Sequence, residues 1–210
     1  MATIALFGAT GKTGRLVLER ALSAGYEVRA LVRDPGKLAT ASGQLAVIKG
    51  DVLDADRVDQ TVVGADVVLS LFGHVGGSPK GLQTDGTRFI VEAMHRHGVK
   101  RLVSLSGGGL RDQQDQPKLA DRAIRLLLRM MAGHVLADAE GHLRVLQASG
   151  LDWTVARAPR LLETPATGSY RVGRVGVNAS TKISRADFAD FVLTQVEDRS
   201  FIRQMPFVSA

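Results

Sequence analysis

The alternation of apolar and polar residues along the first two thirds of the chain predicts strands separated by helices. Short apolar runs stand between stretches in which apolar residues recur at helical spacing, which is typical of a parallel sheet with helical crossovers. The strands are expected at Thr3–Phe7, Glu27–Val32, Ala46–Lys49, Asp66–Leu71 and Arg101–Leu105. The helices between them are expected at about 12–24, 54–62 and 83–97. A glycine that favours a helix end follows each helix, at Gly25, Gly64 and Gly98.

The last third of the chain is less regular. After a polar stretch over 111–117, helices are expected at roughly 118–131 and 134–149. The elements expected after them are a strand over 151–157, a strand near 170–177, a helix over 185–196 and a short strand near Phe207. The whole pattern predicts one Rossmann-type α/β domain over 1–210, doubly wound, with a mostly parallel sheet, helices on both faces and a small C-terminal elaboration from about 159.

Composition narrows the class of protein. The chain has 210 residues, enough to bury one substantial core, and no run of about 18 apolar residues predicts a membrane span. Its first residues run straight into a glycine loop, as a first strand does, and do not resemble a signal peptide. The absence of cysteine excludes disulfides and cysteine-bound metals and agrees with a cytoplasmic protein. The net charge of +6 favours anionic partners, and a phosphate-rich cofactor satisfies it as well as nucleic acid does.

A glycine-rich loop between the first strand and the first helix gives the strongest functional signal. It reads Gly8-Ala9-Thr10-Gly11-Lys12-Thr13-Gly14. A strand that ends in a tight turn and feeds a helix directs backbone N–H groups at one point, where the helix dipole also favours negative charge. Glycines there let a pyrophosphate approach the backbone and let strand and helix pack closely. The loop predicts a dinucleotide site, and the alternative is a tight turn without a ligand.

The run Gly11-Lys12-Thr13 resembles the end of a Walker A loop, but its spacing excludes that motif. A Walker A loop needs a glycine five residues before its Gly-Lys pair, and Leu6 stands there. The preceding glycine, Gly8, is too close to let the loop wrap a triphosphate. A nucleoside triphosphatase is therefore not expected.

The end of the second expected strand indicates which dinucleotide binds. An acidic residue there accepts hydrogen bonds from the ribose 2′-hydroxyl of NAD, whereas an arginine accommodates the 2′-phosphate of NADP. Arg33 follows the apolar run directly, and Lys37 and Lys12 could add positive charge. A guanidinium suits a phosphate because it can donate two parallel hydrogen bonds. NADP(H) is therefore favoured over NAD(H); the alternative is that Arg33 is a solvated residue paired with Asp34.

Longer segments of the chain resemble a known family. They are FGATGKTG, GYEVRALVRDPGKL, KGDVLDADRVDQTVVGADVVLSLFG, GVKRLVSLS and SGLDWTVARAP, followed by TGSY and SRADFADFVL toward the C-terminus. In these segments the chain resembles the atypical short-chain dehydrogenase/reductases, and among them the biliverdin-IXβ reductase/flavin reductase group and its bacterial NAD(P)H-binding relatives. The resemblance implies a Rossmann-type fold and an NAD(P)H cofactor.

The resemblance also implies which residues contact the cofactor, all at the carboxyl ends of strands, where open α/β sheets bind ligands. Those that would flank the adenine are Asp51 and Val52. Those that would pass beside the ribose and the nicotinamide end are Leu71, Phe72 and Gly73. The hydroxyls expected near the nicotinamide are Ser104 and Ser106, and the residues that would close over it are Pro159 and Arg160.

Two departures from the family pattern limit the chemistry. The Tyr-x-x-x-Lys motif is absent, because the residues four after Tyr26 and Tyr170 are Ala30 and Arg174. Carbonyl reduction by that mechanism and sugar epimerisation are therefore not expected. The closest group carries a second hydroxyl directly after the first, where this chain has Gly107. This leaves Ser106 as the catalytic candidate; the alternative is a hydroxyl that satisfies backbone groups at a strand end.

A conjugated acceptor, such as a flavin or a linear tetrapyrrole, tolerates the missing tyrosine. Hydride transfer to it gives a delocalised anion that water can protonate, so the protein mainly orients the reactants. The expected function is an NADPH-dependent reductase of a small conjugated acceptor, active as a monomer or homodimer without nucleic-acid or membrane partners. The alternatives are a non-catalytic NAD(P)(H) sensor of the NmrA type and a reductase of one specialised metabolite.

Two further groups of residues are interpreted structurally. His74 follows the fourth strand and could reach a substrate, whereas His134, Asp138 and His142, spaced four apart, are interpreted as solvated helix surface and not as a metal site. A proton-donor role for His134 or Asp138 is a hypothesis.

A basic stripe lies beside apolar residues in the helix expected at 118–131. Its cations are Lys118, Arg122, Arg125 and Arg129, and the neighbouring apolar residues include Leu119, Leu126, Leu127 and Met130. The stripe is interpreted as part of an amphipathic helix that covers the core or makes a dimer contact. An acidic substrate, a membrane surface or a nucleic-acid backbone are the alternatives, and no interleaved aromatic residue supports nucleic acid.

Overall fold

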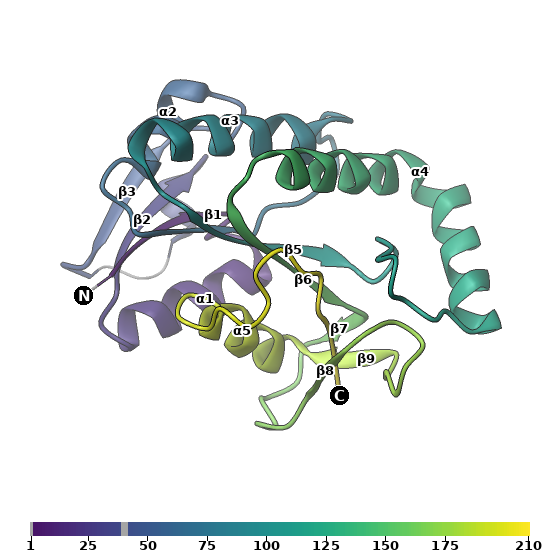
Figure 1. Ribbon diagram of the computed structural model, residues 1–210. Helices are drawn as coiled ribbons and strands as arrows, with labels where there is room; N and C mark the ends of the chain where they lie inside the picture. The colour runs from purple at the N-terminus through teal and green to yellow at the C-terminus, as the bar shows by residue number, and fades with distance from the viewer. Residues whose placement is uncertain (1, 39–41) are drawn as a thin grey trace.

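Strands and helices alternate along the chain and build a sheet with helices on both faces (Figure 1). The computed structural model describes residues 2–38 and 42–210, and within these ranges eight strands form one sheet in the order β3-β2-β1-β4-β5-β6-β10-β8. Neighbouring strands run parallel except β10 and β8. The run β3-β2-β1-β4-β5-β6 is the strand order of a doubly wound Rossmann-type sheet. The expected fold class is confirmed.

The strands of the large sheet are β1 (Thr3–Phe7), β2 (Glu27–Val32), β3 (Leu45–Lys49), β4 (Val67–Ser70), β5 (Arg101–Gly107), β6 (Asp152–Ala158), β8 (Arg171–Gly173) and β10 (Phe207–Ser209). A small parallel pair consists of β7 (Arg160–Leu162) and β9 (Lys182–Ser184). The helices are α1 (Lys12–Ser23), α2 (Ala55–Val62), α3 (Leu82–His97), α4 (Leu119–Ala148), α5 (Arg185–Thr194) and the short 3-10 turn η1 (Pro35–Lys37).

Alternate side chains of the central strands enter two separate apolar cores. In β1, Ile4 and Leu6 pack toward α1 and α5, whereas Ala5 and Phe7 pack toward α2, α3 and α4. Figure 1 shows these two helical layers on opposite faces of the sheet. Burial on both faces explains why the strands are apolar throughout. Because β1 to β6 run parallel, their carboxyl ends lie together at one edge of the sheet.

The predicted boundaries of the first five strands and first three helices lie within two residues of those in the structure. Local signals explain this agreement. Gly98 ends α3 in the left-handed conformation, with a φ of 71°, as a glycine at this position favours. Asp54 begins α2 by accepting a hydrogen bond from the Arg57 N–H.

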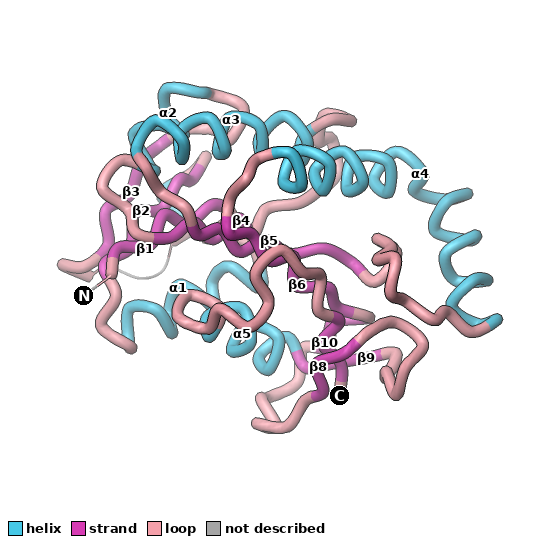
Figure 2. Tube along the Cα trace, in the orientation of Figure 1, coloured by secondary structure: helices cyan, strands magenta, loops and turns pink. Residues whose placement is uncertain are grey.

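The two helices expected at 118–131 and 134–149 are confirmed as the two halves of α4, which breaks between them at Ala132, where φ is −140° and ψ is 39°. The rest of the last third differs from the prediction in two ways. The strand expected near 170–177 is only β8, which pairs antiparallel with β10 (Figure 2). The pair β7 and β9 was not predicted, since a three-residue strand is too short to show a period of two.

The first half of α4 corrects another expectation. Leu119, Leu126, Leu127 and Met130 are exposed, so this part of the helix does not cover the core. The break at Ala132 turns residues 119–131 away from the half that packs on α3 (Figure 1). The helix is amphipathic as predicted, but its apolar side faces solvent.

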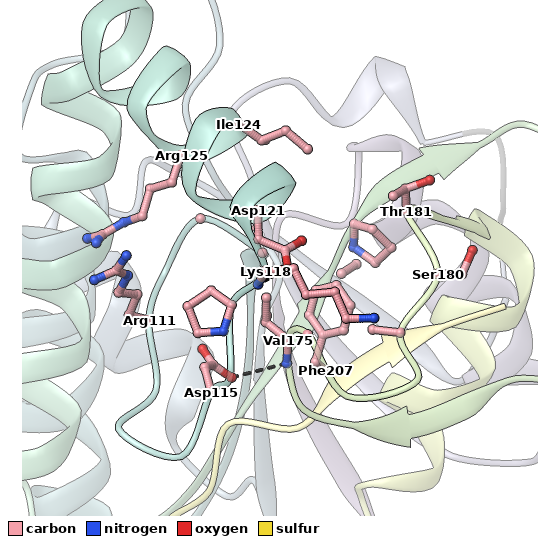
Figure 3. A pocket seen from close by; sticks show the side chains of 18 of the residues that line it. Arg111, Asp115, Lys118, Asp121, Ile124, Arg125, Val175, Ser180, Thr181 and Phe207 are labelled. Atoms are coloured by element: carbon pink, nitrogen blue, oxygen red, sulfur yellow. Dashed lines mark hydrogen bonds between the residues drawn. The ribbon is translucent and has the colours of Figure 1, made fainter.

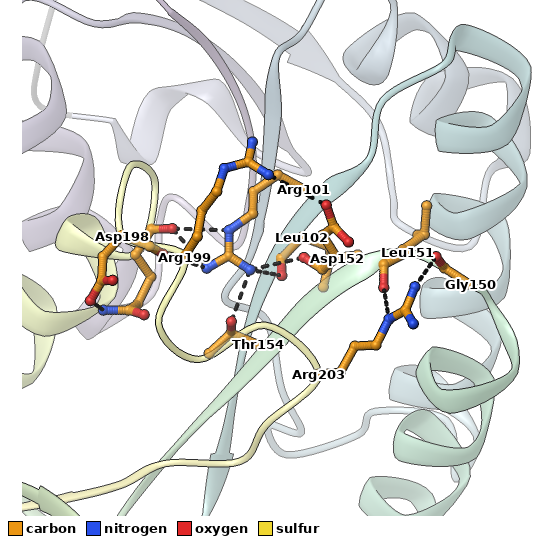
Figure 4. Close-up of polar contacts among 10 residues, drawn as sticks. Arg101, Leu102, Gly150, Leu151, Asp152, Thr154, Asp198, Arg199 and Arg203 are labelled. Carbon is orange, nitrogen blue, oxygen red and sulfur yellow. Dashed lines mark hydrogen bonds and ion pairs between the residues drawn. The ribbon is translucent and has the colours of Figure 1, made fainter.

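Buried Arg101 joins β5 to the segment that follows α5 (Figure 4). Its guanidinium donates hydrogen bonds to the Gln195 and Asp198 carbonyls and to Thr154 Oγ1. Burial lowers the pKa of Arg101 to about 10, so the group stays charged at neutral pH. The contact fixes the amino ends of the strands, opposite the edge at which ligands bind in such sheets.

None of the helices within the described ranges combines the length and the apolar character that crossing a membrane requires.

Candidate functional site

The glycine loop joins β1 to α1 and lies against the residues that follow β4. Gly8 has a φ of +88°, and a Cβ atom there would lie 2.6 Å from the Leu71 carbonyl carbon. A Cβ atom on Gly14 would lie 2.0 Å from the Gly8 carbonyl oxygen. The Gly11 N–H closes the turn with a hydrogen bond of 3.0 Å to the same oxygen. Only glycine fits at Gly8 and Gly14, because the atoms in the way belong to the backbone.

The first turn of α1 presents backbone N–H groups to this loop. Gly11 stands at the N-cap and has no side chain to accept from them, and the first turn holds no acidic residue. Ala9 is buried and Thr10 is half-buried beside them. N–H groups without a helical partner, together with the positive end of the helix dipole, form an anion site. The free N–H groups at the start of α1 therefore fit a pyrophosphate group.

An ion-pair cluster holds this loop from the C-terminal part of the chain. Lys12 Nζ lies 3.0 Å from Glu163 Oε1, and Arg185 Nη2 lies 3.0 Å from the same oxygen. Arg185 Nη1 also donates to Thr13 Oγ1 at 3.0 Å. Hydrogen bonds from Arg185 and Lys12 lower the pKa of Glu163. The segment after β7 and the start of α5 thus lie beside the loop, which the sequence analysis did not anticipate.

Three cationic side chains surround the turn that follows β2. Arg33 is exposed, with Nε 3.9 Å from Asp51 Oδ2, and Lys37 Nζ lies 3.9 Å from Asp34 Oδ2. Arg15 comes from α1 and donates through Nη2 to the Lys37 carbonyl oxygen at 3.2 Å. The structure therefore places Arg33 beside Asp51 and not in an ion pair with Asp34. Such a group of exposed cations suits a phosphate.

The segments after β3 and β4 pack against α3. A Cβ atom on Gly86 would lie 2.9 Å from Phe72 Cζ and 3.0 Å from Val52 Cγ2, so both side chains lie over this glycine. The close packing gives the two segments fixed positions beside the glycine loop. The residues of these segments predicted to contact a cofactor are Asp51, Val52, Leu71, Phe72 and Gly73.

A cavity of about 520 Å³ lies beside the carboxyl ends of β5 and β6 (Figure 3). Its lining includes Gly107 to Gly109 from β5 and the following turn, Ala158 to Arg160 from the end of β6 to the start of β7, and the Phe207 ring. Pro159 and Arg160 therefore lie both in the wall of this cavity and at the carboxyl-end edge of the sheet. Ser106 precedes this lining and is buried. The volume is that of a small-molecule site.

Positive charge dominates the walls of this cavity. The cations are Arg111, Lys118, Arg125 and Arg160. Of the lining carboxylates, Asp121 accepts from the Lys118 N–H at 2.8 Å, and Asp115 pairs with buried Arg157. In Figure 3 the guanidinium groups of Arg111 and Arg125 point to the same side of the cavity. The cavity is therefore suited to an acidic ligand.

The pair Asp115–Arg157 fixes one wall of the cavity. Arg157 Nη1 and Nη2 donate to Asp115 Oδ2 and Oδ1 at 2.6 and 2.9 Å. Asp115 Oδ1 also accepts from the Val175 N–H at 3.1 Å, so the pair links β6 to two loops. Burial raises the pKa of Asp115, but the hydrogen bonds from Arg157 and the backbone outweigh it and lower the pKa overall.

Beneath this edge, a buried histidine connects α3, α4 and β5. His142 accepts or donates through Nε2 to Ser104 Oγ at 3.0 Å and through Nδ1 to Thr87 Oγ1 at 2.7 Å. It is 1% exposed, so its interpretation as solvated helix surface was wrong. Ser104 lies inside β5, and its hydroxyl is held by His142 and faces the helices.

Asp138 is also buried, at 5% exposed, and its side chain binds the backbone at the beginning of α3. Its carboxylate accepts from the Gln83 N–H at 2.7 Å, the Thr84 N–H at 2.9 Å and His74 Nε2 at 2.7 Å. Burial raises the pKa of Asp138, but these hydrogen bonds lower it overall, so the carboxylate stays ionised. The hypothesis that Asp138 donates a proton is wrong for this arrangement. His134 is exposed, with its ring centroid 5.8 Å from that of His74.

Within the described ranges, no group of three or more histidine, cysteine, aspartate or glutamate side chains is arranged to hold a metal ion.

Comparison with known proteins decides the family. A sequence model of the NAD(P)H-binding family matches residues 8–199. The chain belongs to this family. The match runs from the glycine loop to beyond α5, and it supports the resemblance to atypical short-chain dehydrogenase/reductases.

Relatives of this NAD(P)H-binding protein match most of the chain. An uncharacterized chloroplastic protein of Arabidopsis thaliana, At2g34460, is 28% identical over 77% of this chain, which spans 60% of its length. An uncharacterized Bacillus subtilis protein, YwnB, is 28% identical over 92% of both chains. A short-chain dehydrogenase/reductase from Veillonella parvula, solved in complex with NADP, has a TM-score of 0.79 at 18% identity and covers 100% of this chain and 94% of its own. This last likeness shows the fold.

The structure of the NAD(P)H-binding protein gathers most of the predicted site residues at one edge of the sheet. The glycine loop, Arg33 and Lys37 lie after β1 and β2, and the other predicted segments follow β3, β4 and β6. Ser104 is the exception, because β5 continues past it to Gly107. Arg15 was missed, although a cation directly after the last loop glycine was a signal for it. Glu163 and Arg185 had no local signal.

The buried His142 predicts a loss of stability in acid. The unfolded chain protonates this residue below its ordinary pKa of 6.5, whereas burial lowers the folded-state pKa to about 4, against an opposing effect of Asp138. Stability is therefore full above about pH 6.5 and falls as the pH drops toward 4. We expect the wild type to lose about 2 kcal/mol more than His142→Gln between about pH 7 and pH 5, measured by urea unfolding. An equal loss in both proteins would contradict a neutral, buried His142.

Proposed function

We propose that this protein is a cytoplasmic, NADPH-dependent reductase that transfers hydride to a flavin-like or other conjugated small-molecule acceptor. The observation that carries the proposal is the shared edge of the sheet: a glycine cradle at the start of α1, exposed cations after β2, and a cavity after β5 and β6. The bound NADPH would supply the hydride. The work of the chain is to bind and orient both reactants.

The roles proposed for the chain follow from position. The loop Gly8–Gly14 would hold the pyrophosphate at the N–H groups of α1, and Arg33, Lys37 and Arg15 would hold the 2′-phosphate. The segments Asp51–Val52 and Leu71–Gly73 would flank the adenosine and the ribose. This assignment agrees with the family and with the resemblance to biliverdin-IXβ and flavin reductases.

The cavity would take the acceptor. Ser106 would hydrogen-bond the nicotinamide carboxamide or the acceptor, and Pro159 and Arg160 would close over them. A conjugated acceptor suits a site without Tyr-x-x-x-Lys, because the charge that develops on it is delocalised and water can supply the proton.

Arg33 provides the prediction for cofactor choice. We expect Arg33→Ala to weaken NADPH binding by about 10- to 100-fold, since a charge-assisted hydrogen bond contributes about 1.5–3 kcal/mol. NADH binding should change less than about two-fold. Arg144→Ala, which removes an exposed arginine of α4, is the control. Fluorescence titration of both nucleotides measures the effect, and equal losses for NADPH and NADH would contradict the assignment.

Turnover tests the reaction itself. Purified protein is mixed with NADPH and FMN, and the absorbance of the reduced nicotinamide is followed, with linear tetrapyrroles as further acceptors. Consumption that scales with protein concentration and prefers NADPH is the expected result. Tight NADPH binding without consumption of NADPH on any of these acceptors would contradict the reductase and favour a non-catalytic sensor.

A further inference from the structure

The first half of α4, residues 119–131, carries an apolar surface that the rest of the described chain does not cover. We call this surface the α4 arm. Its exposed large apolar residues are Leu119, Ile124, Leu126, Leu127, Met130 and Met131. Leu119 and Met130 are 82% and 77% exposed. Figure 1 shows the arm turning out of the layer that contains α3 and running past the end of the sheet, and the break at Ala132 marks where it turns.

The extent of this surface is that of an interface. Ile124 also lines the cavity, and the other five residues together expose on the order of 700 Å², more than the roughly 300–600 Å² of the largest apolar patch on an ordinary monomer. A standard protein–protein interface takes about 800 Å² from each partner. The α4 arm therefore offers most of the area that a stable dimer needs.

The cations of the arm lie away from this apolar surface. At about 100° per residue, Lys118, Arg122, Arg125 and Arg129 stand about 140–180° around the helix from Leu127. The structure agrees, since Lys118 and Arg125 line the cavity on the inner side, and Arg125 Nη2 pairs with Glu140 Oε1 at 3.0 Å. Two arms could meet along their apolar sides without bringing like charges together.

This arrangement favours a second copy of the chain over a lipid surface. A basic helix on a membrane uses its cations to contact anionic headgroups, but here two of the four, Lys118 and Arg125, face the cavity. No tryptophan, tyrosine or phenylalanine occurs between 118 and 131 to anchor the arm at a membrane interface. One face that is apolar throughout is self-complementary about a two-fold axis, as the interface of a symmetric dimer must be.

We propose that the protein forms a homodimer in which the apolar sides of two α4 arms pack against each other across a two-fold axis. The inner side of each arm keeps its place in the cavity wall, through Lys118, Asp121 and Arg125. Pairing of two arms therefore also fixes this wall of the cavity, which the break at Ala132 places at the edge of the molecule. The proposal does not depend on the reaction that the cavity supports.

Sedimentation velocity of the full chain tests it. The wild type is expected to be dimeric at micromolar concentration. The double variant Leu127→Glu/Met130→Glu is expected to raise the dimer dissociation constant at least about ten-fold, because it would bury two charges between the paired arms. The matched control is Val47→Glu/Val63→Glu, which changes two exposed valines away from the arm and should leave the dimer intact. Circular dichroism checks that both variants keep the helical content of the wild type.

Two results would overturn the proposal. One is a wild type that stays monomeric at tens of micromolar, including the case in which it instead sediments with vesicles containing phosphatidylserine, which would assign the arm to a membrane. The other is a folded Leu127→Glu/Met130→Glu variant that remains dimeric as the wild type does. A dimer lost in that variant and kept in the valine control supports the α4 arm as the interface.

Discussion

Replacing Gly14 with alanine is expected to weaken dinucleotide binding at least about 100-fold and to destabilise the fold by about 2–3 kcal/mol. The added Cβ atom would lie 2.0 Å from the Gly8 carbonyl oxygen and 2.8 Å from its carbon. These atoms belong to the backbone, so the turn must open and the N–H groups of α1 move from the phosphate position. NADPH titration and urea unfolding measure the two effects.

Gly11→Ala is the matched control in the same loop. Its Cβ atom would lie 3.3 Å from the same oxygen, a distance that a small shift relieves. We expect this variant to lose less than about 1 kcal/mol and to retain most of its affinity. A Gly14→Ala protein that binds NADPH as tightly as the wild type would refute the pyrophosphate role of the loop.

Replacing Asp115 with alanine is expected to lower the free energy of unfolding by about 3–5 kcal/mol, because it leaves the charge of Arg157 buried without its partner. Arg157 is 0% exposed and donates two hydrogen bonds to the carboxylate. The variant also frees the Val175 N–H from Asp115, so the cavity wall loses a second contact. Urea unfolding at neutral pH measures the loss.

The exposed pair Asp85–Arg88 supplies the control for this measurement. Its side chains are joined at 2.8 Å but are about half exposed, so Asp85→Ala should cost less than about 1 kcal/mol. If Asp115→Ala were no more destabilising than Asp85→Ala, the buried pair would not be what holds the cavity wall.

The part of the fold that the sequence predicted is the part with local signals. Each central strand is apolar on both faces because both are covered, and each early helix ends at a glycine such as Gly98. The glycine loop and Arg33 could be placed because parallel strands bring their carboxyl ends to one edge. For these residues, the family resemblance and the periodicity of apolar positions led to the same prediction.

The buried polar groups of α4 could not be predicted from periodicity alone. Asp138 and His142 occur at a spacing that fits a solvated face, but that face meets the beginning of α3 and Ser104. Gly141 was a usable signal: a Cβ atom there would lie 2.2 Å from Thr84 Oγ1, so the glycine marks a close approach of two helices. Helix interiors otherwise disfavour glycine.

The direction of the α4 arm could not be predicted from the sequence, for a different reason. The spacing of Leu119, Leu126 and Met130 predicts an apolar side but does not name what covers it. The break at Ala132 decides that question, by turning the arm away from α3. Likewise, the ion pairs of Glu163 with Lys12 and Arg185 join segments far apart in the chain, for which no local pattern exists.

Calorimetric titration of the wild-type protein with NADPH, and with NADH in parallel, tests the central claim most directly. The account predicts one site per chain and binding of NADPH at least about ten-fold tighter than that of NADH, because the cations after β2 contact the 2′-phosphate that NADH lacks. Absence of NADPH binding, or equal affinity for the two nucleotides, would contradict it.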